Sequence, residues 1–126
     1  MRNDTFLHRQ INPSWIQAGR VTSQAFKPTP KDEKQLSVYD GDQISPEDAW
    51  HHYTENLGFS SVGVLAVVVA ECQDLQLGVI PKPEPFPEHA ISDFSDLPNA
   101  QIEKKAKKLR GYAQARGYLY FSETIS

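Results

Sequence analysis

The sequence has few of the features on which disulfide, metal and membrane proteins depend. Its single cysteine, Cys72, excludes an internal disulfide and favours a reducing compartment. No histidine pair has metal-ligand spacing and no cysteines cluster, so we expect no metal site. The longest apolar run, residues 62–70, is too short to cross a bilayer. With no charged-then-apolar leader pattern, we expect a soluble cytoplasmic protein with no membrane partner.

A glycine-rich phosphate loop and an excess of positive charge are also missing. The chain has 126 residues and a formal charge of −3, and this total does not indicate nucleic-acid binding. Its 39% hydrophobic and 23% charged residues are ordinary for a globular protein. The length fits one domain spanning residues 1–126.

Two helices are expected, one in each half of the chain. The first spans about 45–57, because Ser45 can cap it, Pro46 suits the first turn and Asp48 completes a capping box. Gly58 would end this helix. The second spans about 98–116 and has a buried stripe at helical spacing, formed by Ile102, Ala106, Leu109 and Ala113.

Strands are expected at residues 5–11, 21–26, 36–39, 61–71, 89–94 and 118–121. The run 61–71 is rich in valine and predicts a central strand, with a buried helix as the alternative. Four prolines in 78–88 indicate an extended connection without regular structure. We therefore expect a single α+β domain with a mixed, mostly antiparallel sheet and two main helices.

The segment that begins at Phe6 offers the first candidate site residues. It interleaves large apolar residues with His8, Arg9 and Gln10. A histidine suits acid–base chemistry near neutral pH, and an arginine can pair with a phosphate or carboxylate. The alternative is that His8 is a half-buried structural histidine and Arg9 lies on the surface.

His89 and Glu71 are further candidates, because both stand at the end of an expected strand. His89 opens a strand directly after the proline-rich segment, and strand ends and loop mouths are common places for catalytic groups. The alternative is that His89 caps the sheet edge. Glu71 ends the apolar run, where burial could raise the pKa of its carboxyl or the strand could simply emerge into water. His52 is expected to face solvent, opposite Trp50 on the helix.

The order of His8, Tyr39 and Glu71 resembles the His-Tyr-Glu pattern of ADP-ribosyltransferases. The resemblance implies that His8 holds a ribose hydroxyl of NAD, Tyr39 stacks on the nicotinamide and Glu71 assists its departure. It covers three scattered residues and parts of the segment 8–23. The chain is short for that family, and further elements are expected after Glu71.

The second helix carries a cluster of basic residues. Residues 103–116 contain six basic residues and one acidic residue. This cluster could bind a phosphate backbone, or it could be a solvated helix face. Its members are Lys104, Lys105, Lys107, Lys108 and Arg110, and the sixth basic residue, Arg116, extends the patch.

These observations favour a small cytosolic enzyme acting on a nucleotide, NAD or RNA, of the toxin or bacterial defence effector type. Its site would combine His8, Arg9, Tyr39, Glu71 and His89. No cofactor is required by the sequence, although NAD would fit the resemblance. The alternatives are a non-enzymatic, antitoxin-like or regulatory module that binds a protein partner or itself, and a nucleic-acid binder that uses the basic helix.

Overall fold

The computed structural model describes residues 1–28 and 33–122. In this part of the chain six strands form one sheet in the order β6-β7-β4-β1-β5-β8, and every pairing is antiparallel. The expected α+β domain with a mostly antiparallel sheet is confirmed. The strands are β1 (Phe6–Gln10), β4 (Gln35–Asp40), β5 (Gly63–Val68), β6 (Gly78–Pro81), β7 (His89–Asp93) and β8 (Tyr120–Phe121). A small second sheet pairs β2 (Ile16–Gln17) with β3 (Arg20–Val21).

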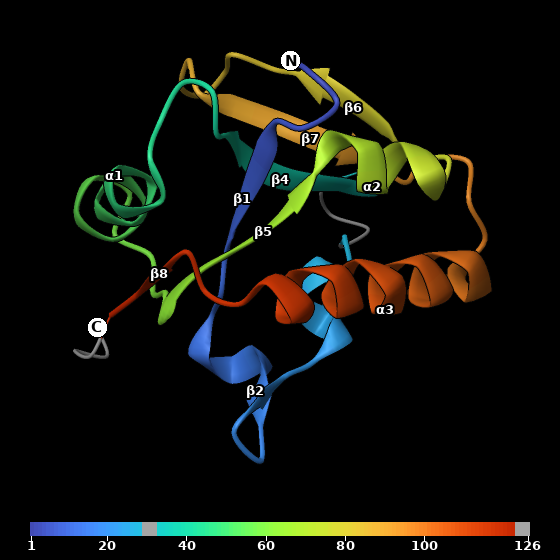
Figure 1. Ribbon diagram of the computed structural model, residues 1–126, viewed down its shortest axis with the longest axis horizontal. Helices are drawn as coiled ribbons and strands as arrows, with labels where there is room; N and C mark the ends of the chain where they lie inside the picture. Colours follow the sequence, from blue (N-terminus) through green and yellow to red (C-terminus); the bar gives the residue numbers. More distant parts are fainter. Residues whose placement is uncertain (29–32, 123–126) are drawn as a thin grey trace.

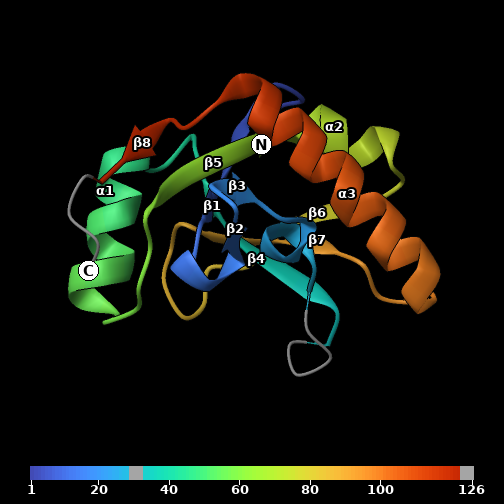
Figure 2. The same ribbon diagram turned by 90° about the horizontal axis from the view of Figure 1, so that it is seen from below.

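The helices lie on both faces of the large sheet. Helices α2 (Val69–Asp74) and α3 (Asn99–Arg116) lie together, whereas α1 (Pro46–His51) stands apart from them (Figures 1 and 2). A π-helix, η4 (His52–Asn56), continues α1 directly. Together α1 and η4 match the first expected helix, and Ser45 accepts the predicted capping bond from the backbone of Asp48.

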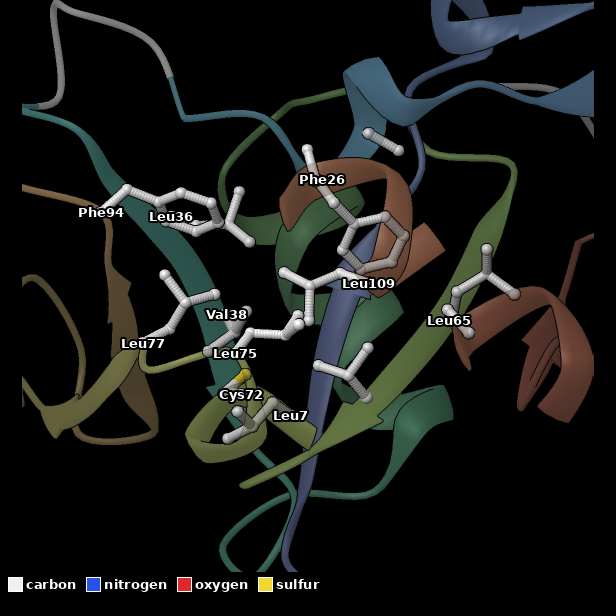
Figure 3. Packing of buried hydrophobic residues seen from close by; sticks show 14 of the residues in the cluster. Leu7, Phe26, Leu36, Val38, Leu65, Cys72, Leu75, Leu77, Phe94 and Leu109 are labelled. Carbon is white, nitrogen blue, oxygen red and sulfur yellow. The ribbon is translucent and has the colours of Figure 1, made fainter. Parts of the chain in front are cut away.

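The hydrophobic core fills the space between the sheet and the pair α2 and α3. One face of β1 and β4 contributes Leu7, Leu36 and Val38 to it. The predicted stripe of α3 packs against this face, with Leu109 fully buried. Figure 3 shows side chains from β1, β4, α2 and α3 converging there. Burying one such leucine contributes about 1.5–3 kcal/mol.

The apolar run 61–71 is not one strand, as the sequence suggested. It is the strand β5 up to Val68 and then turns into α2. Glu71 stabilises the new helix by accepting a hydrogen bond from the backbone N–H of Val68 at 2.8 Å. Val69, Cys72 and Leu75 recur every three residues and face the core, which is a helical spacing that the valine content concealed.

Two other predicted segments also differ from the structure. Residues 21–26 are not an extended piece, because Val21 ends β3 and the 3₁₀ helix η2 (Ser23–Phe26) follows. Residues 78–88 are not wholly irregular, because Gly78–Pro81 form the edge strand β6. Proline is tolerated at the end of an edge strand, where its missing N–H costs no ladder bond.

Within residues 1–28 and 33–122, none of the helices combines the length and the hydrophobicity that a membrane crossing demands.

Candidate functional site

Three of the predicted site residues occupy one rung of the sheet. His8 on β1 lies directly opposite Tyr39 on β4, and Tyr39 lies directly opposite His89 on β7. Directly opposed residues point to the same face, with Cβ atoms about 4.5–5.5 Å apart. The register of three strands therefore aligns two imidazoles and a phenol on the sheet face that points away from α2 and α3.

This rung lies on the floor of a pocket with a volume of about 480 Å³. One wall comes from the end of the first helix and the residues after it, and the other from the loop 82–88 between β6 and β7. A volume of this size is typical of small-molecule sites, which usually span about 300–1,000 Å³. The wall residues are Tyr53, Leu57, Phe59, Lys82, Glu84, Pro85 and Phe86.

His89 is held by hydrogen bonds on both ring nitrogens. Its Nδ1 lies 2.9 Å from the carbonyl oxygen of Lys82, and its Nε2 lies 3.1 Å from Oγ of Ser37. The backbone N–H of Lys82 donates to the carbonyl of His89 at 3.0 Å, so the base of the loop fixes both residues. The imidazole is buried (9% exposed), whereas Ser37 is exposed and lines the pocket.

Tyr39 and Phe86 line the pocket and form an aromatic cluster with His52, which lies behind them. The Tyr39 hydroxyl lies 2.8 Å from Nδ1 of His52. The ring of Phe86 stacks on Tyr39 at 4.9 Å and meets His52 at 4.6 Å between ring centroids. The expectation that His52 faces solvent is therefore wrong. Phe86 covers the side of the helix on which His52 lies. The spacing of apolar residues along the helix could not reveal this contact, because Phe86 comes from a distant segment.

His8 is almost fully buried, with 2% of its surface exposed. Burial lowers the pKa of His8, against smaller opposing effects of the Ile44 backbone and the Asp40 carboxylate. Its Nδ1 and the side-chain nitrogen of Gln10 have no hydrogen-bond partner within residues 1–28 and 33–122. Both residues line the pocket, although these two nitrogen atoms are themselves buried.

Arg9 closes the space where β1 and β4 separate. These strands pair only at Leu7 and His8, and beyond that point the Arg9 guanidinium fills the opening. Its Nε donates to the carbonyl of Ala25 at 2.7 Å and its Nη1 to the carbonyl of Ser37 at 2.8 Å. The cation also lies over the ring of Trp15, at 5.0 Å. Arg9 therefore lines the pocket and also holds the segments around Ala25 and Ser37 together.

Glu71 does not join this site. It lies at the start of α2 and forms a two-point salt bridge with Arg116, at 3.1 Å and 3.0 Å. The same carboxylate caps the backbone of Val68, so its oxygens are committed to structure. The resemblance to the His-Tyr-Glu pattern consequently loses its glutamate, because the strand that should have placed Glu71 at the sheet edge turns into a helix two residues earlier.

The basic cluster lies on α3, which covers the opposite face of the sheet from the pocket. Lys104, Lys107 and Lys108 are exposed. Lys105 donates to the carbonyl of Leu75, and Arg110 is half-buried. The cluster and the pocket therefore do not form one continuous surface.

Sequence reasoning missed several residues that line the pocket. Ser37 shares a strand face with Tyr39 two positions later, which is a pattern the sequence does contain. Tyr53, Phe59 and Phe86 come from segments whose arrangement only the fold defines. Within the described part of the chain, no group of three or more histidine, cysteine, aspartate or glutamate side chains is placed to hold a metal ion. Cys72 is buried in the core, where burial raises the pKa of its thiol to about 11.

Comparison with protein-family models, with curated proteins and with solved structures finds no match for this chain.

Proposed function

We propose that this protein is a small enzyme that acts on a nucleotide bound in the sheet-face pocket. The observation that carries the proposal is the convergence of His8, Arg9, Tyr39 and His89, from three strands, on one hollow. A concave pocket that gathers several polar, titratable side chains is the usual setting of an active site. His89 is the best-placed acid–base group, because its neighbours fix the orientation of its ring.

The aromatic walls favour a flat heterocycle. Tyr53 and Phe59 pack together, with ring centroids 5.1 Å apart, and Phe59 remains 56% exposed at the rim. Stacking of one base on an aromatic side chain contributes about 1–3 kcal/mol. A nucleobase or a nicotinamide ring would find such a surface on this wall.

The charges of the lining favour a ligand with few negative charges. Two cations, Arg9 and Lys82, are balanced by two carboxylates, Glu33 and Glu84. A triphosphate would meet no excess of positive charge here. A mononucleotide, a dinucleotide or NAD fits this lining better, and the position of α3 on the other sheet face argues against a long RNA as the pocket's ligand.

Calorimetric titration with AMP, NAD and a dinucleotide, followed by chromatography of the products, tests the proposal. Phe59→Ala should weaken binding about 5- to 150-fold if one stacked base is lost. Phe121→Ala is the matched control, because Phe121 is equally exposed (55%) but lies outside the pocket. Absence of binding and of turnover for all three ligands would contradict the proposal.

The alternative is a non-enzymatic binding module that uses the same pocket. Such a module would bind a nucleotide and show the Phe59→Ala effect, but the bound ligand would be recovered unchanged. The His89→Gln variant separates the two functions. Glutamine keeps hydrogen-bonding groups at this position but cannot accept a proton at neutral pH. If the protein is an enzyme, this variant should therefore form no product.

The second part of the proposal is that the enzyme acts in the cell as a toxin or defence effector. An enzyme that consumes a shared nucleotide would slow growth when it is expressed in bacteria, and His89→Gln would relieve this effect. Normal growth despite turnover of a cellular nucleotide in vitro would contradict the effector role and leave the enzymatic one intact.

A further inference from the structure

A serine, a histidine and a backbone carbonyl form a continuous hydrogen-bonded chain inside the pocket. The Ser37 hydroxyl lies 3.1 Å from Nε2 of His89, and Nδ1 of His89 lies 2.9 Å from the carbonyl oxygen of Lys82. The sequence did not single out Ser37, and the acid–base role proposed for His89 leaves its partner unexplained.

The carbonyl fixes the tautomer of the imidazole. A carbonyl oxygen can only accept a hydrogen bond, so Nδ1 of His89 must carry a proton to bond with Lys82. In the neutral ring Nε2 then has a lone pair, and the Ser37 hydroxyl is the donor that points at it. This is the arrangement of a hydroxyl nucleophile, a general base and a group that orients the base.

The geometry points to Ser37 as a nucleophile, activated by His89, that attacks a phosphodiester of the bound nucleotide. This inference rests on the proposed nucleotide function and adds the reaction class and a covalent intermediate. A phosphodiester carries one negative charge, which suits a lining whose charges balance.

The proposed reaction has two balanced steps. First, Ser37 Oγ forms a bond to phosphorus while His89 Nε2 takes the hydroxyl proton. The bond from phosphorus to the leaving oxygen breaks, and His89 returns the proton to that oxygen, which gives an alcohol and a phosphoserine diester. Second, water attacks phosphorus, His89 takes a proton from the water, and Ser37 leaves and regains this proton. The products are one alcohol and one phosphomonoester.

Two cations bind to the strand segment that carries Ser37. Arg9 Nη1 lies 2.8 Å from the carbonyl oxygen of Ser37 itself. Lys82 Nζ lies 3.1 Å from the side-chain oxygen of Gln35, which shares the strand face of Ser37 two residues earlier. Positive groups beside the nucleophile stabilise the charge that develops on the phosphoryl oxygens.

A structural tether is the competing explanation, since the same hydrogen bonds hold the loop 82–88 on the sheet. A fluorophosphonate probe distinguishes the two, because it reacts at phosphorus with activated hydroxyls and releases fluoride. We expect peptide mapping by mass spectrometry to place the label on Ser37. Ser37→Ala should abolish this label, and Ser14→Ala, at an exposed serine outside the pocket, should leave it unchanged.

Replacement of the base gives a readout that a tether would not affect. His89→Ala should slow labelling of Ser37 about 100- to 10,000-fold, the usual contribution of general acid–base catalysis. Added imidazole should restore part of the rate by occupying the space left by the ring. A label on another residue, or none on the folded protein, would overturn the assignment, as would a labelling rate that is independent of His89.

The outcomes separate this inference from the proposed function. Nucleotide turnover that persists in Ser37→Ala would refute the nucleophile and leave the enzymatic function in place. Labelling of Ser37 that depends on His89, with neither binding nor turnover of any nucleotide, would refute the proposed substrate and retain the activated serine.

Discussion

The hydroxyl of Tyr39 lies 2.8 Å from Nδ1 of His52, which links the central strand β4 to the π-helix that follows α1. Burial is the main reason why the pKa of Tyr39 is raised well above its usual value, so the phenol stays protonated at all physiological pH values. The hydrogen bond therefore ties the floor of the pocket to its wall. π-Helical segments are rare and are often found at functional sites, which agrees with this position.

Tyr39→Phe removes this link without changing the ring that stacks on Phe86. We expect a loss of about 0.5–1.5 kcal/mol in the free energy of unfolding, the net value of one hydrogen bond. Ligand affinity should fall as well, because the wall is no longer held. Urea denaturation and calorimetry measure the two effects. Tyr118→Phe, at a partly exposed tyrosine outside the pocket, is the control, and an equal response of both variants would contradict the argument.

Glu71 is expected to be a stability residue and not a catalytic one. Its carboxylate holds both Arg116 and the first turn of α2. Glu71→Gln weakens these charge-assisted bonds, and we expect a loss of about 1.5–3 kcal/mol in the free energy of unfolding. The nucleotide affinity of the folded protein should not change.

Glu103→Gln provides the comparison, because Glu103 pairs with Lys27 at the surface and should cost less stability. If Glu71→Gln stopped turnover in a protein that is still folded, Glu71 would have a catalytic role that its position does not provide.

Much of the fold follows from local sequence patterns. Ser45 with Asp48 fixes the start of the first helix, and the stripe through Leu109 fixes the buried face of α3, as predicted. The path of the chain after Val68 could not be obtained in this way. A run of valines suits a strand by propensity, but α2 forms because tertiary packing of Val69 and Cys72 on the core outweighs that preference.

The candidate site was predictable only in part, for a related reason. Strand order is a global property, and it places His8, Tyr39 and His89 side by side although they come from distant parts of the chain. Their chemistry drew attention to them in the sequence, but nothing local indicated that they share a rung. The roles of Ser37 and His52 depend on single contacts between segments, which composition and periodicity do not encode.

Neutralising the basic cluster should leave the pocket unaffected. A triple variant with glutamine at Lys104, Lys107 and Lys108 removes exposed charges on the face of the sheet that lies away from the pocket. We expect unchanged nucleotide affinity and earlier elution from heparin, since phosphate-type contacts respond to charge and salt. A large loss of nucleotide affinity in the triple variant would mean that the two surfaces act together.

The stability of the protein should fall as the pH decreases through the range in which His8 titrates. In the unfolded chain the His8 side chain binds a proton at the ordinary histidine pKa of about 6.5. In the folded protein burial lowers the pKa of His8, so the ring stays neutral at this pH. Protons then favour the unfolded state, so the free energy of unfolding decreases below about pH 6.5, by at most about 1.4 kcal/mol per pH unit, until the folded pKa is reached.

Urea denaturation between pH 5.5 and 7.5 measures this slope. His8→Gln should flatten it, because glutamine does not titrate, although this variant is also expected to be less stable at every pH. His51→Gln is the control. His51 is exposed and pairs with Glu55 at the surface, so its replacement should leave the slope in place. The opposite pattern, with the slope retained in His8→Gln and lost in His51→Gln, would show that the buried imidazole does not control the acid sensitivity of the fold.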